Sequence, residues 1–175
     1  QRTSMNAILS ALGAPGPRAI KTIKRLQDEA KRLARELEEL KLKTALIDLG
    51  GQDKDVIELG DTRFIARKVF KLEKGSLREL ADSLRDRLGR GIVVLASENG
   101  SKVALVVSVS KELIDRVNAG KVVKAIAPII GGGGGGRAEF AEAGGRRPDK
   151  IDALLTKSLT VVGDMLASPA THTET

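Results

Sequence analysis

Six consecutive glycines at Gly131–Gly136, followed by Arg137, are the feature that most restricts how this chain can fold. The run is not placed like a flexible linker, because the apolar segment Lys121–Ile130 leads directly into it and Ala143–Gly145 follows as a second small-residue turn. Glycine adopts positive φ angles and lets two backbones approach closely. The run therefore predicts tight turns whose successive backbone N–H groups form a concavity for an anion, with the guanidinium of Arg137 at its rim.

A purely structural role for the glycine run is the alternative. In that interpretation the turn allows a helix to pack closely on a sheet, and Arg137 pairs with Glu139 or Glu142. The functional interpretation instead gives a set of candidate nucleic-acid-binding residues in and around the run. Its members are Gly134, Gly135, Gly136, Arg137, Arg146, Arg147, Lys150, Lys121 and Lys124, with Lys102, Lys111 and Arg116 as further basic residues nearby in the sequence.

The charge balance favours a polyanionic partner. The chain of 175 residues carries 30 Lys and Arg against 23 Asp and Glu, a formal net charge of +7. A surface of this kind makes salt-dependent contacts to the phosphates of nucleic acid. Phe64 and Phe70 are expected in the core, and Phe140 offers one ring, which is no stacking platform for successive bases.

Several classes of chemistry are excluded by what the chain lacks. It contains no cysteine, which excludes disulfides and thiol catalysis. Its one histidine, His172, lies in a polar tail over residues 167–175, so the rest of the chain holds neither a Ser–His pair nor a His/Cys zinc site. We therefore expect no catalytic residue and no metal site. No apolar run approaches the ~18 residues of a membrane span, and the first residues do not resemble a signal peptide.

Residues 1–49 are expected to form a helical arm. A short helix over Thr3–Leu12 ends at a Gly/Pro-rich turn, and a long helix follows over Arg18–Ile47. Two interpretations of the long helix stay open: it packs against the short helix and the globular domain, or it pairs with a second copy as a coiled coil, for which under three heptads is marginal. Both rest on a seam of apolar residues at heptad spacing, namely Ile23, Leu26, Ala30, Leu33, Leu37 and Leu40.

Residues 50–166 are expected to form the globular domain, an α/β fold with a mixed β-sheet flanked by helices. Strands are expected over Phe64–Phe70, Ile92–Ala96 and Val103–Ser108, with a brief strand around Ile57. The last two long strands are joined by a turn containing Asn99-Gly100, a strong hairpin signal. Because both are almost continuously apolar, the sheet is expected to be covered on both faces.

Four helices are expected to cover this sheet. The first is amphipathic and covers Ser76–Leu88, with Ser76 as its cap and Glu79 as the partner in a capping box. Gly120 is expected to divide the next two, and Phe140–Ala143 is a short strand or turn between the third and the fourth. The remaining helices are expected over Ser110–Ala119, Lys121–Ile130 and Lys150–Leu166.

The glycine segment also resembles a known family. Gly-Gly-x-Gly-Gly-Gly-Arg followed by Ala-x-Ala-Gly-Gly, within residues 131–145, is similar to the DHH-associated C-terminal domain of alanyl-tRNA synthetases. The resemblance continues in LRELADSLRDRLG, in IVVLASENGSKVALVVSVSKEL and in NAGKVVKAIAPIIGG, which start at residues 77, 92 and 118. It extends over roughly residues 18–166 and is specific over about 77–145.

The resemblance implies a non-catalytic, cytoplasmic tRNA-binding domain. Domains of this family contact the elbow of the tRNA and bring the aminoacylation and editing modules together on one tRNA. Arg137 matches the arginine of the family motif. The implied partner is alanine tRNA, with single-stranded DNA as a second candidate and a homodimer through the arm as the alternative function. No cofactor is expected in this chain, since ATP, magnesium and zinc belong to other parts of the parent ligase, of which this chain is a fragment or a free-standing version.

The chain differs from DHH phosphoesterases, and at three positions also from the usual motif of the alanyl-tRNA synthetase family. DHH phosphoesterases, which use a related domain to hold substrate, carry a histidine where Arg137 stands and need a separate Asp/His-rich metal domain, so an enzyme is the less favoured interpretation. Ala138, Glu139 and Glu142 replace the family's frequent proline, aspartate and glutamine. Glu142 adds a negative charge near the proposed phosphate contact, and Arg146 and Arg147 are the residues that could offset it.

Overall fold

A computed structural model describes Ser10, residues 16–50 and residues 55–168. The chain divides into two compact units, residues 1–40 and residues 41–175. The predicted helix over Thr3–Leu12, apart from Ser10, and the polar tail from residue 169 onward lie outside the described residues. None of the helices in the described part of the chain has the length and apolar character needed to cross a membrane.

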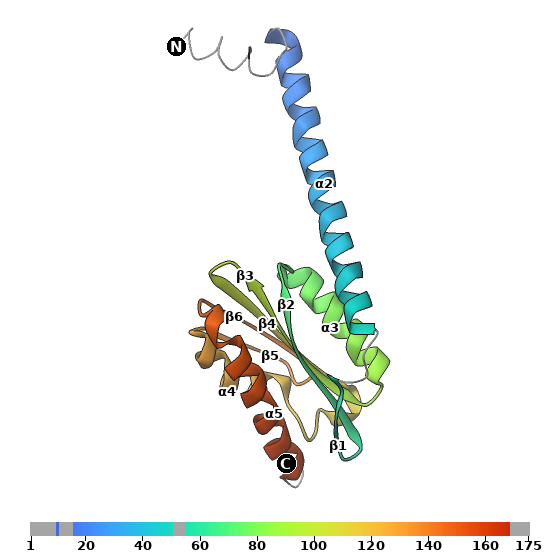
Figure 1. The fold of residues 1–175 in the computed structure, drawn as a ribbon, viewed down its shortest axis with the longest axis vertical. Helices are drawn as coiled ribbons and strands as arrows, with labels where there is room; N and C mark the ends of the chain where they lie inside the picture. Colours follow the sequence, from blue (N-terminus) through green and yellow to red (C-terminus); the bar gives the residue numbers. More distant parts are fainter. Residues whose placement is uncertain (1–9, 11–15, 51–54, 169–175) are drawn as a thin grey trace, which may run out of the picture. The chain divides into compact units, whose positions relative to one another are not determined.

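The arm contains one long helix, α2, over Gly16–Gly50 (Figure 1). This confirms the helix predicted over Arg18–Ile47. The seam residues are on the surface: Leu26 is 47% exposed, Leu33 52%, Leu37 54% and Leu40 60%. Ile23, at 38%, is also exposed. A row of exposed large apolar side chains, interrupted by the small Ala30, marks a surface suited to a partner.

The second unit is built on a six-stranded mixed sheet in the order β1-β2-β3-β4-β6-β5 (Figure 1). Strands β2 and β3 are parallel, and every other neighbouring pair is antiparallel. The predicted α/β class with a mixed sheet is therefore confirmed. The strands cover Ile57–Leu59 (β1), Thr62–Phe70 (β2), Gly91–Asn99 (β3), Lys102–Val109 (β4), Gly133–Gly136 (β5) and Phe140–Gly145 (β6).

Helices cover both faces of the sheet, which explains why the central strands are apolar almost throughout. On β3, Val93 and Leu95 pack with α3, while Ile92 and Val94 belong to the cluster on the opposite face. Period-two alternation sends neighbouring strand residues to opposite faces, so a strand buried on both has no polar face. The covering elements are α3 (Lys74–Leu88) on one side, and α4 (Ala119–Ile126), η3 (Ala127–Ile130) and α5 (Ile151–Ala167) on the other.

The hairpin between β3 and β4 forms where the sequence predicts it. Asn99 pairs with Lys102, which leaves Gly100 and Ser101 as the two loop residues. Gly100 has φ of 61°, the left-handed conformation that a tight hairpin loop requires and that glycine adopts at little cost.

Two of the predicted helix boundaries are wrong. Helix α3 begins at Lys74, with Glu73 before it and no side-chain cap, so Ser76 lies inside the first turn and forms no capping box. The segment predicted as a helix over Ser110–Ala119 contains only the short 3-10 helix η2, Lys111–Leu113. The hydroxyl of Ser110 explains the second error, because it bonds to the loop after α3 instead of capping a helix.

Two further predictions fail at single residues. Gly120 does not divide two helices but lies within the first turn of α4, where it is buried. Phe70 is 65% exposed at the end of β2 instead of lying in the core, and the ammonium of Lys68 lies 5.1 Å from its ring centroid. Phe64, in contrast, is fully buried, as predicted. β6 continues through Gly145, two residues beyond the predicted Phe140–Ala143.

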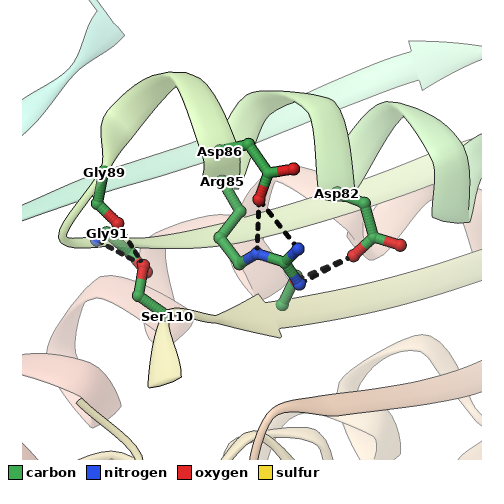
Figure 2. A network of polar contacts seen from close by, with 7 residues as sticks. Asp82, Arg85, Asp86, Gly89, Gly91 and Ser110 are labelled. Atoms are coloured by element: carbon green, nitrogen blue, oxygen red, sulfur yellow. Dashed lines mark hydrogen bonds and ion pairs between the residues drawn. The ribbon is translucent and has the colours of Figure 1, made fainter. Parts of the chain in front are cut away.

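The loop that closes α3 is fixed to the end of β4 by side-chain bonds (Figure 2). Ser110 Oγ accepts a hydrogen bond from the backbone N–H of Gly91 at 2.8 Å and lies within donating distance of the Gly89 carbonyl oxygen at 2.7 Å. Nearby, the guanidinium of Arg85 bonds to Asp82 at 2.9 Å and to Asp86 at 2.8 Å. The pairs of Arg85 lie within α3, and its Nη1 also donates to Ser108 Oγ of β4 at 3.2 Å. This bond and those of Ser110 hold one end of α3 against the sheet.

Candidate nucleic-acid interface

The glycine run forms an edge strand and not the predicted series of tight turns. Gly133–Gly136 is β5, which pairs antiparallel with β6 so that Gly134 faces Ala143 and Gly136 faces Ala141. Within the run, Gly131 alone has positive φ, at 64°. The prediction of a turn is correct at that residue, which ends η3, and wrong for the rest of the run.

Close approach of backbones is what the glycines provide. A Cβ atom added to Gly134 or Gly136 would overlap the backbone of β6. On the other side of the strand, a Cβ on Gly120 would lie 2.8 Å from the carbonyl oxygen of Gly136, well inside ordinary contact. The alternative of close helix–sheet packing is therefore confirmed, because α4 lies against β5 at a distance that side chains would prevent.

The predicted concavity of successive N–H groups is not formed by β5. Along an antiparallel strand, consecutive backbone groups point alternately toward and away from the neighbouring strand. The N–H of Arg137 bonds to the Phe140 carbonyl oxygen at 2.8 Å, which fixes the alternation. The backbone N–H and C=O groups of Gly133 and Gly135 therefore point toward β6, and those of Gly134 and Gly136 point away from it. An anion at this edge would therefore contact single backbone N–H groups, and not the predicted concavity of several successive ones.

Arg137 begins the turn between β5 and β6, and its backbone environment is well defined. The carbonyl oxygen of Ala138 accepts a hydrogen bond from Ala119 N–H at 2.9 Å, at the start of α4. The carbonyl oxygen of Glu139 accepts one from Val109 N–H at 2.8 Å, at the end of β4. The side chain of Arg137 is exposed. A rigid turn therefore presents a solvent-facing guanidinium.

The predicted pairing of Arg137 with a neighbouring carboxylate is wrong for the described residues. Glu142 lies 4.0 Å from the ammonium of Lys74 on α3, and Arg137 forms no ion pair with Glu139 or Glu142 in the described part of the chain. The charge that Glu142 adds is thus directed toward Lys74. It does not neutralise Arg137.

The structure separates the predicted basic residues into two groups. Lys121 and Lys124 are exposed on α4, which lies along β5 close to Arg137. Arg146 and Arg147 instead follow β6, and both of their N–H groups bond to the Ile130 carbonyl oxygen, at 2.9 and 3.0 Å. The two groups lie at opposite ends of β5, separated by roughly 17 Å of extended chain between residues 132 and 137.

The remaining predicted basic residues differ in what they contact. Lys150 is exposed at the start of α5, and Lys102 is exposed beside Arg146 in the β4–β6 register. Lys111 is exposed beyond the other end of β4. Arg116 has a structural contact, since its Nη2 donates to the Leu166 carbonyl oxygen at 2.7 Å and its Nη1 lies 3.7 Å from Asp61.

Sequence reasoning missed two lysines that the fold brings beside Arg146. Lys71 follows β2 and Lys74 starts α3, and both are exposed at the same end of the sheet as Lys102. Neither stands near the glycine run in the sequence, so only the strand order could have placed them. Among the described residues there is no group of three or more His, Cys, Asp and Glu side chains that could hold a metal ion.

Comparison with known proteins identifies the family to which this arrangement belongs. The DHHA1 domain model matches residues 61–163, which is more than half of the chain. The chain belongs to the DHHA1 domain family. It is also similar to the C-Ala domain of alanyl-tRNA synthetase from Aquifex aeolicus, with 35% sequence identity and a TM-score of 0.57 over 65% of this chain and 98% of that one.

This DHHA1 domain is similar to a region of whole ligases as well. It is 38% identical to an alanine–tRNA ligase from Roseiflexus sp. over 93% of the chain, but the match spans only 18% of that relative's length. An exopolyphosphatase-related protein from Bacteroides fragilis has a TM-score of 0.51 at 10% identity, which shows a shared fold and nothing more. The resemblance read from the glycine segment is therefore confirmed at the level of the domain family and its alanyl-tRNA synthetase branch.

Proposed function

We propose that this chain is a tRNA-binding module that acts as the C-terminal domain of an alanyl-tRNA synthetase. One observation carries the proposal: three exposed cations, Arg137, Lys121 and Lys124, lie along an edge strand that has no side chains of its own. Folded RNA offers a curved surface of phosphates, which is recognised through shape and charge more than through base edges. A bare backbone beside fixed cations allows such a surface to approach closely.

The domain is proposed to hold a particular tRNA at a particular place. Similarity to the C-Ala domain of an alanyl-tRNA synthetase supports alanine tRNA as the partner. On the family resemblance of the glycine segment, we further propose that the domain contacts the tRNA elbow and bridges the aminoacylation and editing modules in the cytoplasm. Ligase activity is not expected of this chain, because it corresponds to only 18% of a relative named as a ligase. ATP, magnesium and zinc are accordingly assigned to other parts of such a ligase. Single-stranded DNA is a weaker candidate, since the exposed Phe70 is a single ring and the ring of Phe140 already has the Arg78 guanidinium 4.4 Å from its centroid.

Substitution of Arg137 tests the proposal. We expect Arg137→Ala to weaken tRNA binding by roughly 1–2 kcal/mol, or about 5- to 30-fold, because one charge-assisted contact to phosphate is lost. Binding is measured by titrating fluorescently labelled alanine tRNA at two salt concentrations. Arg63→Ala is the matched control, since Arg63 is also exposed but stands at the start of β2. Equal affinities for wild type and the folded Arg137 variant would assign the glycine segment a structural role alone.

The exposed seam on α2 supports a second candidate function, association of two copies through the arm. Ile23, Leu26, Leu33, Leu37 and Leu40 are all at least 38% exposed, and such a row at heptad spacing is what a coiled-coil partner covers. Sedimentation velocity of the chain at tens of micromolar separates the two ideas. A dimer that becomes a monomer on Leu33→Glu supports this role, and a monomeric wild-type chain removes it.

A further inference from the structure

A second basic surface lies at the end of the sheet opposite Arg137. An open cavity is lined there by the end of β2, the start of α3, the β3–β4 loop and the segments that flank β5 and β6. Five cationic residues contribute to the lining: Lys41 of α2, and Lys71, Lys74, Lys102 and Arg146 from four segments in and around the sheet. Lys71 and Lys74 are distant from the glycine run in the sequence, and only the fold gathers them with Lys102 and Arg146. We call this surface the sheet-end groove.

We propose that the sheet-end groove binds the sugar–phosphate backbone of the same tRNA at a point separate from Arg137. The inference rests on the proposed function and adds a second contact to it. The charge balance supports an anionic ligand, because Glu73 is the one acidic residue of the described lining and Glu142 is 4.0 Å from Lys74. Five cations against these two carboxylates leave the groove positive.

The segment that carries Lys71 and Lys74 is held rigidly, as a binding surface requires. The N–H of Leu72 donates to Ser97 Oγ at 3.1 Å, and Ser97 Oγ donates to the Leu72 carbonyl oxygen at 2.8 Å. Asn99 Nδ2 donates to the same carbonyl oxygen at 2.7 Å. Leu72 and Ser97 are buried, so these bonds are protected from water. The two lysines therefore start from a fixed backbone and lose less freedom on binding.

A strained backbone conformation also occurs in the sheet-end groove, at Lys71. Lys71 has φ of 56°, and it is the one non-glycine residue with positive φ among the described residues. A lysine in this conformation is uncommon, and such strain concentrates at functional sites. It turns the chain sharply between β2 and α3, which brings Lys71 and Lys74 to the same cavity as Lys102.

The rest of the groove lining is better suited to the sugar–phosphate backbone of a nucleic acid than to its bases. Gly131, Gly132, Gly144 and Gly145 contribute main chain to the lining. A Cβ added to Gly132 or Gly145 would overlap neighbouring backbone, so these two glycines serve close packing within the domain. The groove is lined by no aromatic ring in the part of the chain that the structure describes, and stacking of a base therefore has no platform. Cations without stacking groups are suited to phosphates, and phosphate contacts fix the orientation of a nucleic acid without reading its sequence.

The test compares two triple variants that remove the same charge. Lys74→Gln, Lys102→Gln and Arg146→Gln together neutralise the groove. Arg63→Gln, Arg87→Gln and Lys157→Gln form the control, because these exposed side chains lie outside the groove and the Arg137 surface. Each variant lowers the formal net charge of +7 by three. Binding of labelled alanine tRNA is measured across a salt series, and NMR spectra confirm that each variant is folded.

We expect the groove variant to bind tRNA at least about tenfold more weakly at low salt, with a salt dependence reduced by about two to three released ions. The control should change affinity by less than about threefold, because only general attraction is lost. Equal losses in both variants, or no loss in the groove variant, would overturn the inference while leaving the proposed tRNA binding intact. Failure of the wild-type chain to bind tRNA would instead overturn the proposed function, and the groove with it.

A cross-linking measurement gives an independent answer. The chain contains no cysteine, so Lys102→Cys creates a unique attachment point for a photoactivated cross-linker in the groove. Lys157→Cys on α5 is the matched control. Cross-links to tRNA from residue 102 but not from residue 157, in a complex formed at moderate salt, support the groove. Equal yields from both positions would contradict it, and a single-stranded DNA of equal length shows whether the folded shape of the RNA matters.

Discussion

The contact between α4 and β5 gives a sharp prediction for Gly120→Ala. The added Cβ would lie 2.8 Å from the Gly136 carbonyl oxygen, about 0.6 Å short of the 3.4 Å at which ordinary contact begins. The neighbour is backbone of a paired strand and cannot rotate away. Overpacking of this kind costs about 1–3 kcal/mol, and the better helix propensity of alanine returns at most about 1 kcal/mol. We expect a net loss of about 1–2 kcal/mol of unfolding free energy.

Gly163→Ala provides the matched control. Gly163 lies in α5, and a Cβ added there meets nothing within 4 Å. The same substitution should therefore stabilise the domain by about 0.4–1 kcal/mol, through helix propensity and reduced freedom of the unfolded chain. The two substitutions are expected to change the free energy of unfolding in opposite directions because of one steric contact. This difference in sign tests the contact better than either value alone.

The assay must report the sheet domain and not the arm. The chain has no Trp or Tyr for fluorescence, and the long helix α2 contributes strongly to far-UV circular dichroism. Amide NMR signals of β3 and β4, followed through a urea titration, report the domain directly. With an m-value of about 2 kcal/mol/M, the midpoint for Gly120→Ala should fall by about 0.5–1 M. A midpoint that rises as it does for Gly163→Ala would refute the close contact between helix and strand.

Two further substitutions test the rest of the domain. Ser110→Ala leaves the buried N–H of Gly91 without its 2.8 Å acceptor and should cost about 1–3 kcal/mol, whereas Thr156→Ala, at an exposed helix position, should change little in the same titration. The hydrogen bond to Glu98 raises the pKa of Lys68 above 10.5, so this pair stabilises the fold below that pH and loses its effect as pH rises through the higher folded value. Lys68→Gln should therefore destabilise the domain at pH 7, by an amount that shrinks as pH rises through the raised folded pKa of Lys68; a pH-independent difference in urea midpoint would contradict this explanation.

Features written locally in the sequence could be predicted, and features that depend on distant residues could not. The Asn99-Gly100 hairpin and the two-sided burial of β3 and β4 follow from turn chemistry and from apolar runs. The start of α3 does not, because it depends on Leu72 bonding to Ser97, 25 residues away. Phe70 has the composition of a core residue, yet it stands at the last position of β2, where it is 65% exposed.

In the candidate site, too, some features could be predicted from local sequence and others depend on distant residues. Arg137 could be singled out from the motif, and its exposure on a rigid turn agrees with a binding role. The conformation of Gly133–Gly136 could not be derived, since glycine suits a turn, a linker and a strand alike, and pairing with β6 decides among them. The role of Gly120 depended on Gly136, and the gathering of Lys71 with Lys102 and Arg146 depended on strand order.

Rigidity and access are combined at the edge of this sheet by the same residues. An exposed edge strand invites pairing with other chains, and proteins usually blunt it with charged side chains or cover it. In this domain β5 has no side chains, and α4 approaches it so closely that Gly120 meets the Gly136 carbonyl oxygen. That contact also places Ala119 to bond the turn that carries Arg137. A substitution that moves α4 outward should therefore loosen this turn as well, so Gly120→Ala should weaken tRNA binding even at temperatures where the domain stays folded, whereas Gly163→Ala should leave it unchanged.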